Sequence, residues 1–214
     1  MFIRLELRGE LSRSMIYWSP IFAVILSFIA GTIMFTMLGV DPVAAIRTFF
    51  IDPLTTLDGF AELFVKATPL VLIAVGLSFG FQANVWNIGA EGQLTIGALA
   101  GGGIALAFFN VDSPLLLPGM IIAGVLGGMA WAAIPAFLKT KYDTNEILTS
   151  LMLTYVGLLV LSYLIHGPWK DPEGQNFPES RLFHEAAVIP IILEETRLHL
   201  GWVMALFGVV LAWL

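Results

Sequence analysis

The feature that most constrains this chain is a pair of long apolar runs separated by a short polar stretch. Residues 67–90 and 92–111 contain no Lys, Arg, Asp or Glu, and the one carboxylate between them is Glu91. Uncharged apolar runs of about 18 or more residues are typical of membrane-spanning helices. A charge near the bilayer centre costs roughly 2.5–3.5 kcal/mol, so such a residue usually faces protein or a water-filled cavity.

The whole chain shares this apolar character. Of its 214 residues, 58% are hydrophobic and only 12% are charged, which is far too apolar for a soluble domain of this size. We therefore predict an all-α, polytopic membrane protein with about six transmembrane helices and a broken helix around residues 84–93. The expected spans are residues 17–38, 67–81, 94–109, 115–138, 147–165 and a sixth run that starts at 200.

The basic residues suggest an orientation. Arg4, Arg8 and Arg13 lie in the tail at residues 1–13, and Lys139 and Lys141 lie in the connection after the fourth span. Short loops rich in Lys and Arg usually stay in the cytoplasm, so we expect a cytoplasmic N-terminus. The long polar segment at 166–198 is then extracytoplasmic. Residues 41–66 are expected to form an outward-facing interfacial loop with some amphipathic helix, not a span.

The break at 84–93 carries the candidate pathway residues. Glycines weaken a helix, and discontinuous membrane helices are where transporters build binding sites. If this stretch were helical, Asn87 and Glu91 would lie one turn apart on one face. Two readings stay open: these groups line a polar translocation route, or they form a structural brace in which Glu91 caps a helix end or pairs with a cation. The candidates are Asn84, Asn87, Gly89, Glu91, Gly92 and Gln93.

A second polar motif precedes the fifth span. Asn145 and Glu146 follow Asp143 and Thr144 directly before an apolar run. Asn is a good helix N-cap and acids suit the first helical turn, so we expect a cap here, with contact to a cytoplasmic partner as the alternative. The Gly76/Gly80, Gly97/Gly101 and Gly124/Gly128 pairs predict close helix packing.

Other chemistries find little support. The chain has no cysteine and no phosphate-binding loop, and the spacing of His166, His184 and His199 matches no zinc motif. We expect no metal and no cofactor. No basic patch suggests nucleic acid, and no nucleophile motif surrounds a serine. The chain is therefore not expected to be an enzyme, although a membrane-embedded enzyme using Glu91 or a histidine is the alternative from a different class.

Three stretches resemble a known family, and the resemblance as a whole spans most of residues 67–202. Trp86-Asn-Ile-Gly-Ala-Glu-Gly-Gln93 resembles the signature of permease subunits of bacterial ATP-binding-cassette (ABC) importers for nucleosides, within the ribose and branched-chain amino acid permease superfamily. Residues 144–155 resemble a second hallmark of this family, and residues 167–174, 176–178 and 196–199 resemble its outer loop. Position 154 is Thr where the family pattern has Asn.

This resemblance implies a transmembrane permease that moves nucleosides or similar small polar solutes inward. It implies four partners: a second permease subunit, a cytoplasmic ABC ATPase, an extracytoplasmic substrate-binding lipoprotein and the lipid bilayer. It implies no nucleic-acid partner. The expected location is the bacterial inner membrane. Residues 1–214 would be the N-terminal part of one permease domain, since the sixth run stops at Leu214. One alternative is an ABC permease with another cargo, a simple sugar or an amino acid. Another alternative is a different mechanism, that of a stand-alone secondary transporter.

Overall fold

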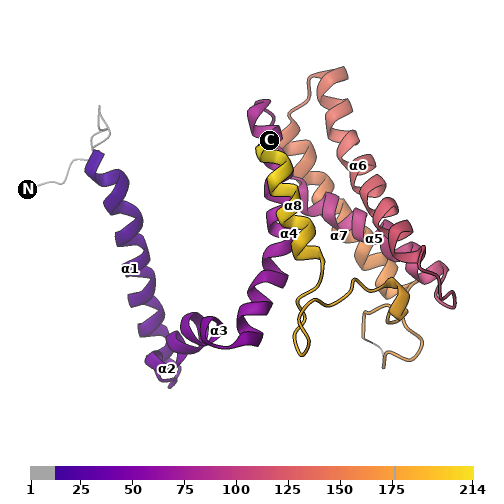
Figure 1. Ribbon diagram of the computed structural model, residues 1–214. Helices are drawn as coiled ribbons and strands as arrows, with labels where there is room; N and C mark the ends of the chain where they lie inside the picture. The colour runs from indigo at the N-terminus through magenta and orange to yellow at the C-terminus, as the bar shows by residue number, and fades with distance from the viewer. Residues whose placement is uncertain (1–12, 176) are drawn as a thin grey trace, which may run out of the picture. The chain divides into compact units, whose positions relative to one another are not determined.

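The computed structural model describes residues 13–175 and 177–214, and these residues are mainly helical (Figure 1). The expected tail at 1–13 lies outside them except for Arg13. The only β-type pairings in the described residues are isolated bridges, Lys170 with Ser180 and Ile191 with His199. The helices are α1 (Arg13–Met37), α2 (Pro42–Ile46), the π-helix η1 (Arg47–Ile51), α3 (Asp52–Thr55), α4 (Leu57–Gln82), α5 (Ala90–Ala107), α6 (Leu116–Tyr142), α7 (Glu146–His166), the 3-10 helix η2 (Glu185–Ala187) and α8 (Gly201–Trp213).

Four of these helices are long and apolar enough to cross a membrane: α1 from Ser14, α4, α6 and α7. The all-helical prediction is confirmed, but six spans are not. The expected third span falls on α5, which has 18 residues and whose hydropathy is lowered by Glu91, Gln93 and five glycines. The expected sixth span falls on α8, which has 13 residues.

The α4 helix begins ten residues earlier than the sequence predicts. Residues 57–66 belong to this 26-residue helix, so the second span does not begin at Ala67 and this part of the 41–66 segment is not a loop. The prediction is wrong because the charged residues between 57 and 66 were expected to lie in a loop. Asp58, Glu62 and Lys66 recur every four residues, which gathers them on one face of a helix and leaves the other faces apolar.

The chain divides into two compact units, and the division falls within α4. The first unit ends at Leu63. Within it, Phe28 and Phe35 of α1 contact Phe50 and Phe49 of η1, with ring centroids 5.1 and 6.3 Å apart. The side chain of Asp41 accepts a hydrogen bond from the Val43 N–H and so caps α2.

The second unit, from Phe64 onwards, is organised around α5, which packs on both α6 and α7 (Figure 1). Small residues permit this close packing. A Cβ added at Gly97 would lie 2.9 Å from the carbonyl oxygen of Gly124, and one at Gly101 would lie 2.9 Å from that of Met120. The Gly97/Gly101 and Gly124 positions therefore bring the backbones of α5 and α6 together, as their spacing predicts. The same prediction is wrong for Gly76 of the Gly76/Gly80 pair, where an added Cβ would meet no atom within 4 Å.

The α8 helix packs against α4 in the same unit. The rings of Phe64 and Trp202 lie 4.7 Å apart, and an added Cβ at Gly208 would lie 3.6 Å from the Cδ2 of Leu72. Between α7 and α8 the segment 167–200 is mostly irregular, with only the short helix η2 among its described residues. This segment corresponds to the long polar stretch expected at 166–198.

Candidate functional site

The polar break is a non-helical connection of seven residues between α4 and α5. The α4 helix ends at Gln82 and α5 begins at Ala90. Asn87 thus lies outside any helix, and the arrangement that would place it one helical turn from Glu91 is wrong. The flanking helices cannot continue through this stretch because its backbone turns sharply at Asn84, which has a φ of 55°.

Asn84 ends α4 rather than lining a cavity. The Asn84 N–H donates to the carbonyl of Phe81, and the Val85 N–H donates to that of Gly80 at 2.9 Å. This pair of bonds is the Schellman motif, which needs a left-handed residue at its centre. Asn adopts that conformation more readily than most residues, and its exposed side chain is free of packing constraints.

Asn87 and Gln93 form the centre of the site. Asn87 Nδ2 donates to Gln93 Oε1, and Gln93 Nε2 donates to Asn87 Oδ1, each at 3.2 Å. The same Asn87 oxygen accepts a 2.9 Å hydrogen bond from the Gly89 N–H. This local bond holds the Asn87 side chain against the backbone that leads into α5. The two amides, six residues apart, are thus joined by reciprocal hydrogen bonds across the end of the break.

Gly89 and Gly92 bring the break against α7. A Cβ added at Gly89 would lie 2.8 Å from Ser150, and one added at Gly92 would lie 2.7 Å from the Cα of Thr154. The Ile88 N–H also donates to Ser150 Oγ at 3.3 Å. Ser150 and Thr154 are buried, and sequence reasoning did not single out Ser150 because its partner is 62 residues away.

Thr154 stands where the resemblance to nucleoside-type permeases leads us to expect Asn. Its hydroxyl donates to the carbonyl of Ser150 at 3.2 Å, one turn earlier in α7. This bond keeps the hydroxyl satisfied within its own helix, and the backbone at 154 faces Gly92. The residue at this position therefore bears on the packing of α7 against α5.

Glu91 stands apart from the amide pair. It occupies the first turn of α5, and its side chain is exposed in this chain. The N-cap of α5 is Gly89, which has no side chain to bond the helix end, so Glu91 is not the cap. A carboxylate in the first turn still stabilises the helix through its dipole.

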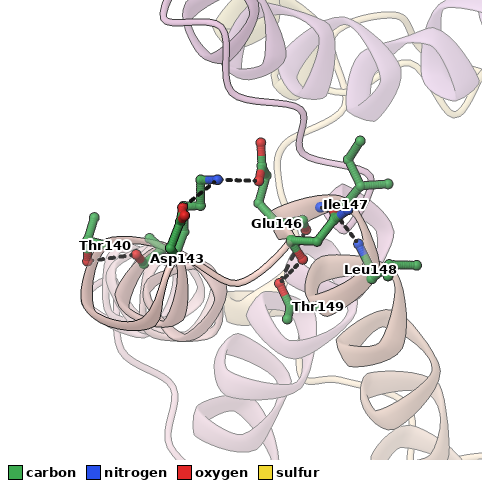
Figure 2. A network of polar contacts seen from close by, with 9 residues as sticks. Thr140, Asp143, Glu146, Ile147, Leu148 and Thr149 are labelled. Atoms are coloured by element: carbon green, nitrogen blue, oxygen red, sulfur yellow. Dashed lines mark hydrogen bonds and ion pairs between the residues drawn. The ribbon is translucent and has the colours of Figure 1, made fainter.

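Asn145 caps α7. Its Oδ1 accepts hydrogen bonds from the N–H groups of Ile147 and Leu148, at 2.9 and 3.2 Å. Figure 2 shows this end of α7 beside the end of α6. Lys139 Nζ lies between two carboxylates here, 3.2 Å from Asp143 and 3.4 Å from Glu146. The Lys139–Glu146 pair joins the last turn of α6 to the first turn of α7, whereas the Lys139–Asp143 pair lies within the end of α6.

Two cavities adjoin the break. The larger, which we call the His199 cavity, has a volume of about 560 Å³ and extends from Thr68 to Leu77 along α4. The smaller, the Lys139 cavity, has about 310 Å³ and reaches Thr140 and Glu146. Both volumes lie in the range of roughly 300–1,000 Å³ that is usual for small-molecule sites. Asn87 and Gln93 line both cavities, whereas Asn84 and Glu91 line neither.

The described residues contain no group of three His, Cys, Asp or Glu side chains placed to hold a metal ion. Two of the histidines make local backbone contacts instead. Nδ1 of His184 accepts from the Ala186 N–H, and Nδ1 of His199 accepts from the Gly201 N–H.

These features define a helical membrane protein whose polar groups meet beside an interrupted membrane segment. Comparison with known proteins identifies the family. Residues 59–214 match the model described as "Branched-chain amino acid transport system / permease component". The chain belongs to this family of permeases, which are transport subunits rather than enzymes.

Several relatives carry more specific names. The chain is 40% identical over 190 residues to a glucose ABC transporter permease protein of Haloferax volcanii, covering 88% of this chain and 49% of the relative. It is 27% identical over 200 residues to a guanosine ABC transporter permease protein of Bacillus subtilis, covering 91% and 56%. A nucleoside ABC transporter permease protein of Lactococcus lactis is 28% identical over 147 residues, covering 69% and 40%. The chain thus spans about half the length of these relatives. No solved structure matches.

Proposed function

We propose that this chain forms part of an ABC importer permease that moves a small, uncharged, hydroxyl-bearing solute into the cell. The solute that we propose first is a nucleoside. ATP would be hydrolysed on a separate cytoplasmic ATPase, and a second permease subunit and an extracytoplasmic binding lipoprotein would complete the complex. The protein would lie in the cytoplasmic membrane with its N-terminus inside. Asn87, Gly89, Gly92 and Gln93 would lie beside the pathway, with Asn84 and Glu91 as helix-end residues.

The observation that carries this proposal is the Asn87–Gln93 amide pair, which lines two cavities of ligand size. Neutral amides donate and accept hydrogen bonds without a net charge, which suits an uncharged sugar or base. Lys139, which lines one of the two cavities, contacts two carboxylates, so it adds no unbalanced positive charge there. The named relatives for guanosine and nucleosides support the same class of solute.

A simple sugar is the second candidate. The 40% identity to a glucose permease of Haloferax volcanii is higher than the identity to the two nucleoside permeases, and it favours a hexose. A hexose and the ribose of a nucleoside present the same hydroxyl chemistry, so an amide pair suits either solute.

The test is ATP-dependent uptake by vesicles that hold the full-length permease with its neighbouring subunits. Radiolabelled nucleosides and glucose are offered in turn, in competition with unlabelled nucleoside, ribose, glucose and leucine. Nucleoside uptake that only unlabelled nucleoside blocks would support the first candidate. Glucose uptake without nucleoside uptake would replace it with the second, and competition by leucine alone would contradict both.

A further inference from the structure

The two cavities follow one another along α4. The part of α4 that lines the His199 cavity runs from Thr68 to Leu77, and the part that lines the Lys139 cavity runs from Gly76 to Gly80. From residue 68 to residue 80 a helix rises by about 18 Å. The cavities therefore succeed each other along the helix axis and meet at Gly76 and Leu77.

The amide pair lies at the same junction. Four residues line both cavities: Gly76, Leu77, Asn87 and Gln93. Gly76 leaves room there, because a Cβ added at this position would meet no atom within 4 Å. The junction thus has an open glycine on α4, an apolar side chain beside it, and two hydrogen-bonded amides.

The hydrogen-bonding capacity of the pair is only partly used. Each side-chain NH₂ group carries two N–H donors and each amide oxygen accepts two bonds. Asn87 Oδ1 has both acceptor positions occupied, by Gly89 and Gln93. In the described part of the chain, one N–H of each amide and one acceptor position of Gln93 Oε1 are left for a ligand.

The two amides also differ in how firmly they are held. Asn87 is bonded to the backbone N–H of Gly89 as well as to its partner. Among the described residues, the side-chain hydrogen bonds of Gln93 run only to Asn87, and this longer side chain has one more rotatable bond. Gln93 can therefore turn away from Asn87 towards a ligand while Asn87 stays in place.

From this geometry we propose that the junction of the two cavities is the solute-binding site, with Asn87 as its fixed polar contact and Gln93 as its mobile one. The ligand class is an uncharged solute with adjacent hydroxyl or carbonyl groups, which accept from the two free N–H donors. A solute bound here is within reach of both cavities. The proposal rests on the transport function proposed above.

The test uses cysteine protection in the full-length protein, because these 214 residues contain no cysteine. Any cysteine elsewhere in the protein is changed to Ser, and Gly76→Cys is introduced at the junction. The rate of its reaction with a small uncharged maleimide is measured without nucleotide, with and without adenosine, glucose or leucine. Gly31→Cys is the matched control, because a Cβ at Gly31 also meets nothing within 4 Å and Gly31 lines neither cavity.

Saturating adenosine or glucose is expected to slow the reaction of Gly76→Cys at least fivefold and to leave Gly31→Cys unchanged, and leucine is expected to protect neither. Gln93→Ala should abolish the protection, whereas Thr95→Ala, on the same helix but outside both cavities, should preserve it. A Gly76→Cys that does not react, that no hydroxylated solute protects, or that stays protected in Gln93→Ala overturns the proposed site.

Uptake by the same preparation separates this proposal from the function on which it rests. ATP-dependent uptake without protection of Gly76→Cys would overturn the binding site and leave the transport function in place. Protection without uptake would support the site and contradict the transport function.

Discussion

Replacing Gly92 with Ala is expected to loosen the packing of α5 on α7. The new Cβ would lie 2.7 Å from the Cα of Thr154 and 3.2 Å from its N and Oγ1. Carbon atoms in contact prefer about 3.5–4.0 Å, so the two backbones must separate by roughly 0.8 Å or more. Because the opposing atoms belong mainly to the backbone, no side-chain rotation relieves the overlap.

The energetic cost combines two opposing terms. Overpacking of a tight interface costs about 1–3 kcal/mol. Ala is a better helix former than Gly by up to about 1 kcal/mol, which offsets part of this cost. Because the 2.7 Å overlap is with a backbone atom, we take the upper part of the overpacking range, about 2–3 kcal/mol. The net loss is then about 1–2 kcal/mol, or roughly a 5- to 30-fold fall in the ratio of folded to unfolded protein. Unfolding of the purified full-length protein in detergent, titrated with SDS, measures this difference.

Gly76→Ala is the matched control, because it makes the same chemical change in a helix where the new Cβ meets no atom within 4 Å. It should leave stability unchanged or raise it by up to about 1 kcal/mol. Equal stability of Gly92→Ala and Gly76→Ala would refute the close approach of α5 and α7 at this point.

Three further outcomes are expected. Asn145→Ala removes the acceptor for two N–H groups of α7 and should lower stability by about 0.5–2 kcal/mol in the same SDS titration, whereas Asn145→Asp should not. Asn84→Gly should leave the free energy of unfolding unchanged, whereas Asn84→Val should lower it by about 1–2 kcal/mol, because Gly accepts a φ of 55° and Val does not. Similar stabilities of the two variants would contradict the Schellman motif at the end of α4. Asn87→Ala should reduce solute uptake in vesicles more than Glu91→Ala does, with membrane insertion intact in both, because only Asn87 lines the cavities.

Several features of the fold follow from local sequence. The Asn145-Glu146 pair before an apolar run predicted the start of α7, because capping depends on residues within one turn. The Gly97/Gly101 and Gly124/Gly128 spacings predicted a close helix contact, since small residues four apart make a flat strip on one face. The polar stretch after Phe81 predicted an interruption, because glycines and amides favour other conformations than the helix.

Other features depended on contacts between residues far apart in the chain. The pairing of Gly89 with Ser150 and of Gly92 with Thr154 joins positions about 60 residues apart, and no local pattern encodes which helix opposes which. The predicted start of the second span at Ala67 is wrong. Asp58, Glu62 and Lys66 indicate a loop when each is considered singly, whereas their period of four fits the helix that the structure has there.

The sequence by itself determined that this chain is a helical membrane protein with a polar interruption after its second long apolar segment, because hydropathy and helix-breaking residues act locally. Only the tertiary structure decided what the polar residues do. Asn84 ends a helix, the Glu91 side chain is exposed, and Asn87 and Gln93 form hydrogen bonds with each other where two cavities meet. These roles differ although the residues are neighbours, because the sharp turn at Asn84 and the glycine contacts with α7 set the direction of each side chain.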